Sequence, residues 1–98
     1  MKIVKNVENA VMKISLDGRL DTLTAPQLET EIQGKMEGIT ELEFDFDNLA
    51  YISSAGLRVL LTAQKIMNKQ GSMIIRNVKS EIKEIFEVTG FSDILTLA

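Results

Sequence analysis

The sequence contains no cysteine, no histidine and no tryptophan, and it has a single proline among its 98 residues. Without cysteine the chain can form neither disulfides nor thiolate metal sites, which is compatible with a reducing cytosol. Without histidine it lacks Ser-His-Asp and Cys-His catalysis, the usual zinc sites and the commonest acid/base group at neutral pH. We therefore expect a protein that is not an enzyme and binds no metal or other cofactor, with a carboxylate or lysine enzyme as the open alternative.

Basic residues and long apolar runs are also few. Eleven Lys and Arg against 14 Asp and Glu leave a net charge of −3, which opposes non-specific nucleic-acid binding. No apolar run approaches the roughly 18–20 residues of a membrane-spanning helix, and residues 1–6 lack the apolar stretch of a signal peptide. These features predict a cytoplasmic protein that contacts neither nucleic acid nor membrane.

The hydrophobic pattern predicts one domain over residues 1–98, without linkers or internal repeats. Period-two alternation predicts strands at 2–7, 11–17, 41–47 and 72–76, and a last short strand at 93–97. Helical periodicity and capping residues predict helices at about 24–38, 54–69 and 79–89. The order β-β-α-β-α-β-α-β is that of an α/β fold with a mixed sheet and parallel crossovers.

Local residues indicate where these elements begin and end. Gly18 is expected to end the second strand, and Gly90 to cap the last helix. Thr24 is expected to cap the first helix with its hydroxyl, just before Pro26 in the first turn, where a missing N–H has no consequence. Buried helix positions are expected at Leu28, Ile32 and Met36 in the first helix and at Ile82, Ile85, Phe86 and Thr89 in the third.

The segment 41–47, Glu-Leu-Glu-Phe-Asp-Phe-Asp, alternates most regularly of all. Its apolar side chains point to one face and its four carboxylates to the other. A strand covered on both faces would be apolar throughout. We therefore expect the acidic face to be exposed to solvent and the helices to pack mainly on the other face. A cation site on the acidic row is the alternative.

Two serines, Ser53 and Ser54, stand where this strand passes into the next helix, at the carboxyl end of the sheet, where open α/β sheets place their sites. One interpretation is that either serine only caps the helix, which is worth roughly 1 kcal/mol. The other is that a phosphate on the serine meets the unpaired N–H groups and partial positive charge of the helix start and makes a neutral surface anionic. Gly56 destabilises a helix by about 1 kcal/mol relative to alanine, which suggests close approach by another backbone or by a partner.

The second helix carries a polar, mostly basic stripe of Arg58, Thr62, Lys65 and Lys69. Most of its other positions are apolar or small. Together they form an apolar arc around the helix that is wider than packing on one sheet face requires. Burial of the arc between neighbouring helices is one interpretation. Exposure of its first turn to a partner is the other.

Three segments resemble the STAS domain family, and within it the anti-sigma factor antagonists of bacterial stress and sporulation circuits. The resemblance covers nearly the whole chain. The matching segments are Leu16-Asp17-Gly18-Arg19-Leu20-Asp21 followed by Thr24-Ala25, then Ile52-Ser53-Ser54-Ala55-Gly56-Leu57, and last Ile85-Phe86-Glu87-Val88-Thr89-Gly90-Phe91.

The resemblance implies a mixed sheet of four or five strands with helices on one side, a monomer without catalytic activity, and a signalling role in transcription regulation by partner switching. Such proteins bind an anti-sigma factor that is also a serine kinase and so release a sigma factor. The kinase inactivates them by phosphorylation, and a PP2C-type phosphatase restores them. The target serine lies two positions before the motif glycine, which corresponds to Ser54 and Gly56. The implied partner-binding residues are Asp21, Ser53, Ser54, Ala55, Gly56, Leu57 and Arg58.

One position departs from the family pattern, because Ser53 stands where family members often carry aspartate. The departure favours a second hypothesis, a STAS module that is not phosphorylated and serves as a scaffold or small-ligand sensor. Asp21 matches an acidic position of the family, and its other interpretation is capping or stabilisation of the turn before Thr24. A receiver-type phosphoacceptor at Asp45 or Asp47 is a further alternative, although the acidic pair expected after a first strand is missing.

Overall fold

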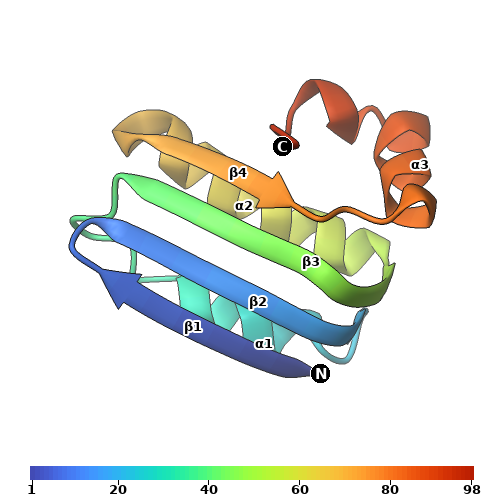
Figure 1. Cartoon of the computed structure of the whole chain (residues 1–98), viewed down its shortest axis with the longest axis horizontal. Helices are drawn as coiled ribbons and strands as arrows, with labels where there is room; N and C mark the ends of the chain where they lie inside the picture. The colour runs from blue at the N-terminus through green and yellow to red at the C-terminus, as the bar shows by residue number, and fades with distance from the viewer.

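Four strands form one mixed sheet in the computed structural model, which describes all of residues 1–98. Its strand order is β1-β2-β3-β4, with β1 antiparallel to β2 and the other pairs parallel. Helices α1 and α2 lie against one face of the sheet, and α3 lies past the carboxyl end of β4 (Figure 1). The elements are β1 Lys2–Glu8, β2 Val11–Leu20, α1 Ala25–Ile32, β3 Glu41–Ile52, α2 Ser54–Gln70, β4 Ser72–Arg76, α3 Ser80–Thr89 and the 3-10 turn η1 Phe91–Asp93. The predicted mixed α/β fold, with helices mainly on one face, is confirmed.

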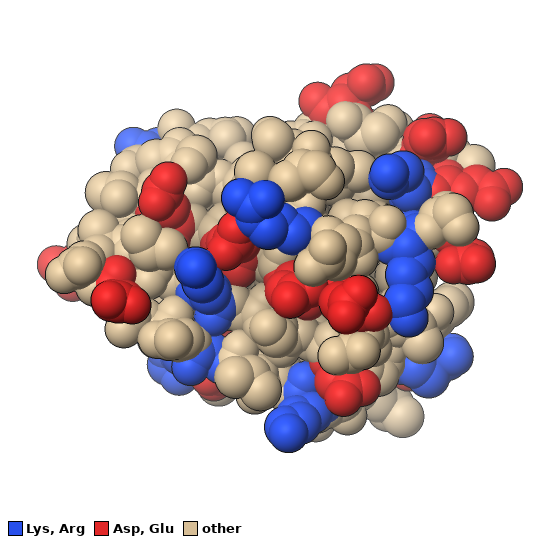
Figure 2. Space-filling model, in the orientation of Figure 1, with Lys and Arg blue, Asp and Glu red and all other residues tan.

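The alternation in β3 explains why the helices pack on one face. Leu42, Phe44 and Phe46 are at most 1% exposed, and the two phenyl rings lie 5.8 Å apart between centroids. The carboxylates of β3 lie on the opposite face, which no helix covers. Acidic and basic side chains are interleaved across this open face (Figure 2). Helices on this face would have to desolvate these charges, which is unfavourable.

Strands β2 and β3 run further than their sequence pattern indicated. Gly18 does not end β2: it lies inside the strand at φ +116°, next to a shift in the β2–β3 register. Glycine tolerates this backbone, so pairing resumes and β2 continues to Leu20. β3 likewise continues to Ile52, which pairs with Leu20. The two extensions bring both strand ends to the start of α2.

Helix α1 is shorter than predicted. It ends at Ile32, and Gly34 then turns the chain at φ +74°. Met36 is buried as expected, but it lies outside the helix. The side chain of Gln70 donates hydrogen bonds to the carbonyls of Met36 and Ile39, each at 2.6 Å, and so ties this loop to the end of α2. Burial alone therefore did not identify the helix end.

The elements α2, β4 and α3 begin and end within one residue of their predicted positions. Gly90 caps α3 in the left-handed region, at φ +83°, as predicted. The predicted burial of Thr89 is wrong, because this residue is exposed. Its hydroxyl donates to the carbonyl of Ile85 at 2.7 Å, so the polar group is satisfied within its own helix.

The segment 93–97 was predicted to be a strand, and this is wrong. The chain turns tightly after α3, and the amide of Leu95 donates to the carbonyl of Phe91 at 2.8 Å. Only one isolated parallel bridge, between Ile75 and Leu97, adds to the edge of β4. The sheet therefore has four strands.

Helix α2 packs most of its apolar arc into the core, which confirms the burial interpretation for this arc. Its buried apolar side chains are Leu57, Val59, Leu60, Ala63 and Met67. The polar stripe that begins at Arg58 is exposed along its whole length. Neither α2 nor any other helix combines the length and apolar character needed to cross a membrane.

Candidate functional site

The two adjacent serines have different roles in the turn from β3 to α2. Ser53 is the N-cap of α2: its backbone is extended, and its Oγ accepts a hydrogen bond from the amide of Gly56 at 3.4 Å. Its own amide donates to the carbonyl of Leu20 at 2.9 Å. Ser54 is the first residue of α2, is exposed, and takes part in none of the side-chain hydrogen bonds of the chain. The capping interpretation therefore applies to Ser53, and the hydroxyl of Ser54 is free.

Gly56 is required by packing inside the protein. A Cβ atom on this residue would lie 2.7 Å from Cγ of Leu20 and 2.8 Å from Cγ1 of Ile52. Both neighbours are buried side chains at the paired ends of β2 and β3. The expected approach by another backbone or by a partner is therefore wrong as the reason for this glycine. Its absent side chain lets the first turn of α2 rest directly on the sheet.

Asp21 organises the turn between β2 and α1. Its Oδ1 accepts hydrogen bonds from the amides of Leu23 at 3.0 Å and Thr24 at 3.1 Å. Desolvation raises the pKa of Asp21, but these hydrogen bonds, the Thr24 hydroxyl and the charge of Arg19 together hold the pKa below its ordinary value. The interpretation of Asp21 as a turn-stabilising residue is confirmed.

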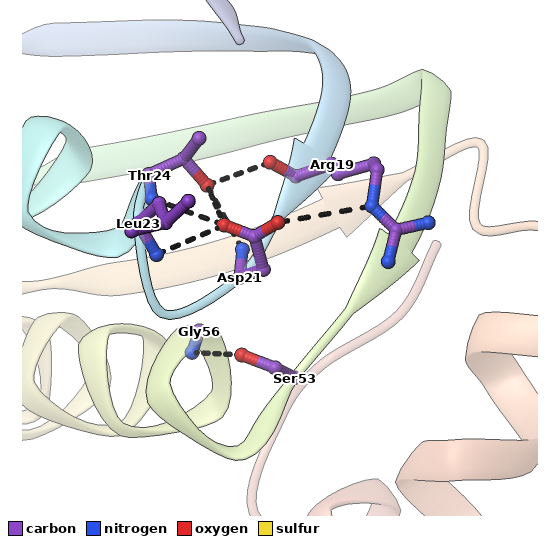
Figure 3. Close-up of polar contacts among 6 residues, drawn as sticks. All are labelled: Arg19, Asp21, Leu23, Thr24, Ser53 and Gly56. Atoms are coloured by element: carbon purple, nitrogen blue, oxygen red, sulfur yellow. Dashed lines mark hydrogen bonds and ion pairs between the residues drawn. The ribbon is translucent and has the colours of Figure 1, made fainter.

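The hydroxyl of Thr24 belongs to the same turn and does not cap α1 as predicted. It donates to the carbonyl of Arg19 at 2.6 Å and accepts from the amide of Asp21 at 2.9 Å. Thr24 occupies the N-cap position, but its helical backbone conformation prevents the usual capping geometry. Figure 3 shows this turn and the Ser53–Gly56 turn together at the ends of β2 and β3.

Three residues of this surface could not be identified from the sequence. The guanidinium carbon of Arg19 lies 4.3 Å from the ring centroid of Tyr51, and its Nε is 3.7 Å from Oδ2 of Asp21. This arrangement depends on the β2–β3 pairing, in which Arg19 and Tyr51 are opposite each other. Leu23 is 85% exposed, and only its apolar character within a polar loop could have drawn attention to it.

The structure brings the predicted partner-binding residues together, but not all of them reach the surface. Asp21, Ser53 and Ala55 are half-buried, and Ser54 and Arg58 are exposed. Gly56 and Leu57 are buried beneath them. These two residues can support a docking surface from below, but they cannot contribute contact area to a partner.

The acidic row of β3 is held by neighbouring polar groups. Glu43 forms ion pairs with Arg76 and Lys13. The side chain of Asn77 donates to Oδ1 of Asp45 at 3.0 Å, and the amide of Asp47 donates to the same oxygen at 2.9 Å. These hydrogen bonds, the one from Asn77 first, lower the pKa of Asp45, against a smaller opposing effect of desolvation. Glu43 and Asp45 thus have partners within the protein, and no group of three or more carboxylates is placed to hold a metal ion.

The fold and the site define a small mixed α/β domain whose free serine and exposed polar groups gather at the carboxyl ends of two parallel strands. A family model described as the STAS domain matches residues 2–98. The chain belongs to the STAS domain family.

Its relatives include BtrV of Bordetella bronchiseptica, named as an anti-sigma factor antagonist. BtrV is 34% identical over 100 residues, which cover 100% of this chain and 86% of that protein. The anti-sigma-B factor antagonist of Bacillus subtilis is 28% identical over 96 residues, covering 97% of this chain and 87% of that protein. Among solved structures, the Bacillus cell fate determinant SpoIIAA in its phosphorylated form shares the fold, with a TM-score of 0.78 at 20% identity over 99% of this chain and 91% of that chain.

Proposed function

We propose that this chain is an anti-sigma factor antagonist, a cytoplasmic signalling protein without catalytic activity. It binds an anti-sigma factor that is also a serine kinase, and a sigma factor is released. Phosphorylation of Ser54 by that kinase switches the protein off, and a PP2C-type phosphatase restores it. The names of its relatives support the antagonist role. The observation that carries the switch is the exposed hydroxyl of Ser54, free of hydrogen bonds on the first residue of α2.

The division of roles between the two serines makes this switch physically simple. Ser53 caps α2, so modification of Ser54 leaves the cap in place. The first N–H groups of a helix have no intrahelical acceptor and carry a partial positive charge, which favours an added anion. A phosphate brings about −1.5 to −2 charges at neutral pH. A partner surface complementary to the small neutral hydroxyl would therefore lose affinity through charge mismatch and desolvation.

Intact-mass measurement after incubation with the cognate kinase and ATP tests the switch. The wild-type chain should gain one phosphate, and Ser54→Ala should gain none. Ser80→Ala is the matched control, because Ser80 is also an exposed serine on the first residue of a helix, α3. This control should be phosphorylated like the wild type. No mass change with a kinase that is active on another substrate would reject the switch.

A second function, a STAS module that is not phosphorylated, is favoured by Ser53 in the usual aspartate position. A hollow of about 560 Å³ on the open face of the sheet, lined in part by Lys13, Glu41 and Arg76, could hold a small polar ligand. Thermal stabilisation by a nucleotide or a lipid in the absence of kinase would support this function. Ligand binding without any phosphate transfer would replace the first proposal by the second.

A further inference from the structure

A groove runs between α1 and the first turns of α2, and Ala55, the residue after Ser54, lies on its wall. It has a volume of about 310 Å³. Its walls carry mostly small or short side chains, so a segment of another protein can approach both helices closely. Residues that line it are Ala25, Pro26 and Glu29 on α1 and Ala55, Arg58 and Thr62 on α2.

Arg58 is the arginine without an ionic partner. The chain has three arginines, and Arg19 and Arg76 pair with Asp21 and Glu43, respectively. Arg58 is exposed and lies within 4 Å of no carboxylate, not even that of Glu29 across the groove. A guanidinium binds carboxylate or phosphate through two parallel hydrogen bonds, and these charge-assisted bonds are among the stronger ones in proteins. An unpaired arginine on a groove wall is therefore suited to an anionic group.

Helix geometry places Arg58 on the part of the groove wall that is nearest to Ser54. Residues four apart on a helix are neighbours, with Cβ atoms about 5–6 Å from each other. Long helical side chains lean toward the N-terminus of their helix, so the guanidinium of Arg58 can reach a group attached to Ser54, one turn earlier. Ala55 and Thr62 continue the groove wall on the other side of Arg58. The guanidinium of Arg58 can thus bind either an anionic group in the groove or a group attached to Ser54.

We propose that Arg58 binds a carboxylate of the anti-sigma factor in this groove, and that a phosphate on Ser54 competes with that carboxylate for the same guanidinium. This inference rests on the proposed function and adds a mechanism to it. In the unphosphorylated protein Arg58 is free for the partner. In the phosphorylated protein the guanidinium of Arg58 binds the phosphate oxygens. The partner's carboxylate then faces the negatively charged phosphate and no longer has a free guanidinium to bind.

Binding of the anti-sigma factor by calorimetry tests the competition. Four proteins are needed: wild type and Arg58→Gln, each with serine or with phosphoserine incorporated at residue 54 during synthesis. Arg58→Gln should weaken binding of the unphosphorylated protein by roughly ten- to a hundredfold, as expected for a charge-assisted pair. The factor by which phosphoserine raises the Kd should then be at least about tenfold smaller in Arg58→Gln than in the wild type.

Lys65→Gln is the matched control, because Lys65 is an exposed cation without an ionic partner on the same stripe of α2. It removes the same charge but should leave both affinities within about twofold of the wild type. Equal affinities of wild type and Arg58→Gln, or an equal effect of phosphoserine in both, would overturn the proposal. Failure of the wild type to bind any anti-sigma factor would instead reject the proposed function.

A second measurement needs no partner. The second pKa of a phosphoserine is about 6, and a paired guanidinium lowers it because it favours the dianion. Titration of phosphoserine 54 by phosphorus NMR should therefore give a lower pKa in the wild type and in Lys65→Gln than in Arg58→Gln. The same pKa in all three proteins would show that Arg58 does not pair with the phosphate, whatever the partner does.

Discussion

Replacement of Gly56 by alanine should destabilise the protein, although alanine is the better helix former. The added Cβ would lie 2.7 Å from Cγ of Leu20 and 2.8 Å from Cγ1 of Ile52. Both atoms are bonded directly to the Cβ of a buried side chain. Rotation about the outer bonds of these side chains therefore cannot relieve the contacts. Either the first turn of α2 or the paired ends of β2 and β3 must move.

The magnitude follows from two opposing effects. Overpacking of a well-packed site costs about 1–3 kcal/mol. Exchange of glycine for alanine inside a helix stabilises by about 1 kcal/mol. The mid-range of the first effect exceeds the second, which leaves a net loss of about 1 kcal/mol in the free energy of unfolding. For a domain of this size that loss lowers Tm by roughly 4–8 °C.

Thermal and urea unfolding of Gly56→Ala measure this loss, and a double-mutant cycle identifies its cause. Leu20→Ala removes Cγ and Cδ2, which are two of the three atoms nearest to the added Cβ. It should be strongly destabilising by itself, by about 2–5 kcal/mol. In that background the Gly56→Ala change should cost clearly less than in the wild type, because two of the three close contacts are gone and only the one with Cγ1 of Ile52 is left. An unchanged or raised Tm for the single Gly56→Ala variant would refute the packing explanation.

Three other variants test separate contacts. Asp45 has a lowered pKa, so its carboxylate contributes stability that is complete above its ordinary pKa of 3.8 and is lost as the pH falls through the folded value. Asp45→Asn should therefore be less stable than the wild type near pH 7, and the difference in free energy of unfolding should shrink below pH 3.8; a pH-independent difference would contradict this. Ser53→Ala removes a long cap hydrogen bond and should lower stability by about 0.5–1 kcal/mol in urea unfolding, while phosphorylation at Ser54 persists. Thr24→Val removes a hydroxyl that serves two backbone groups and should lower stability by about 1 kcal/mol or more; a Tm equal to that of the wild type would show that water replaces it.

The parts of the fold that the sequence predicted well are those whose local pattern and tertiary environment agree. The alternation of segment 41–47, the periodicity of α2 and the short apolar run of β4 each indicate one element only. The errors occur where tertiary contacts override the local residue. β2 continues through Gly18 because pairing with β3 resumes beyond it. The segment 93–97 fails to form a strand because the turn after α3 keeps its backbone curled.

The position of the candidate site could be predicted from the sequence, but the separate roles of its residues could not. Two adjacent serines at a helix start are equivalent in sequence, and only the extended backbone of Ser53 shows which one is the cap. The contact between the Arg19 guanidinium and the Tyr51 ring depends on a pairing with two register shifts, which no local pattern encodes. The reason for Gly56 likewise required knowledge of which buried side chains lie beneath it.

These contacts bear on how a phosphate could act at Ser54. The amide of Ser53 is bonded to the carbonyl of Leu20, Leu20 pairs with Ile52, and the first turn of α2 rests on both through Gly56. The start of α2 is thus held to the sheet by backbone hydrogen bonds and by close packing, and none of these contacts involves the hydroxyl of Ser54. A modification there has no internal contact to break, so its effect must come from the charge and the volume that it adds to the surface. That is the condition under which a neighbouring unpaired cation, Arg58, can decide which anion the surface accepts.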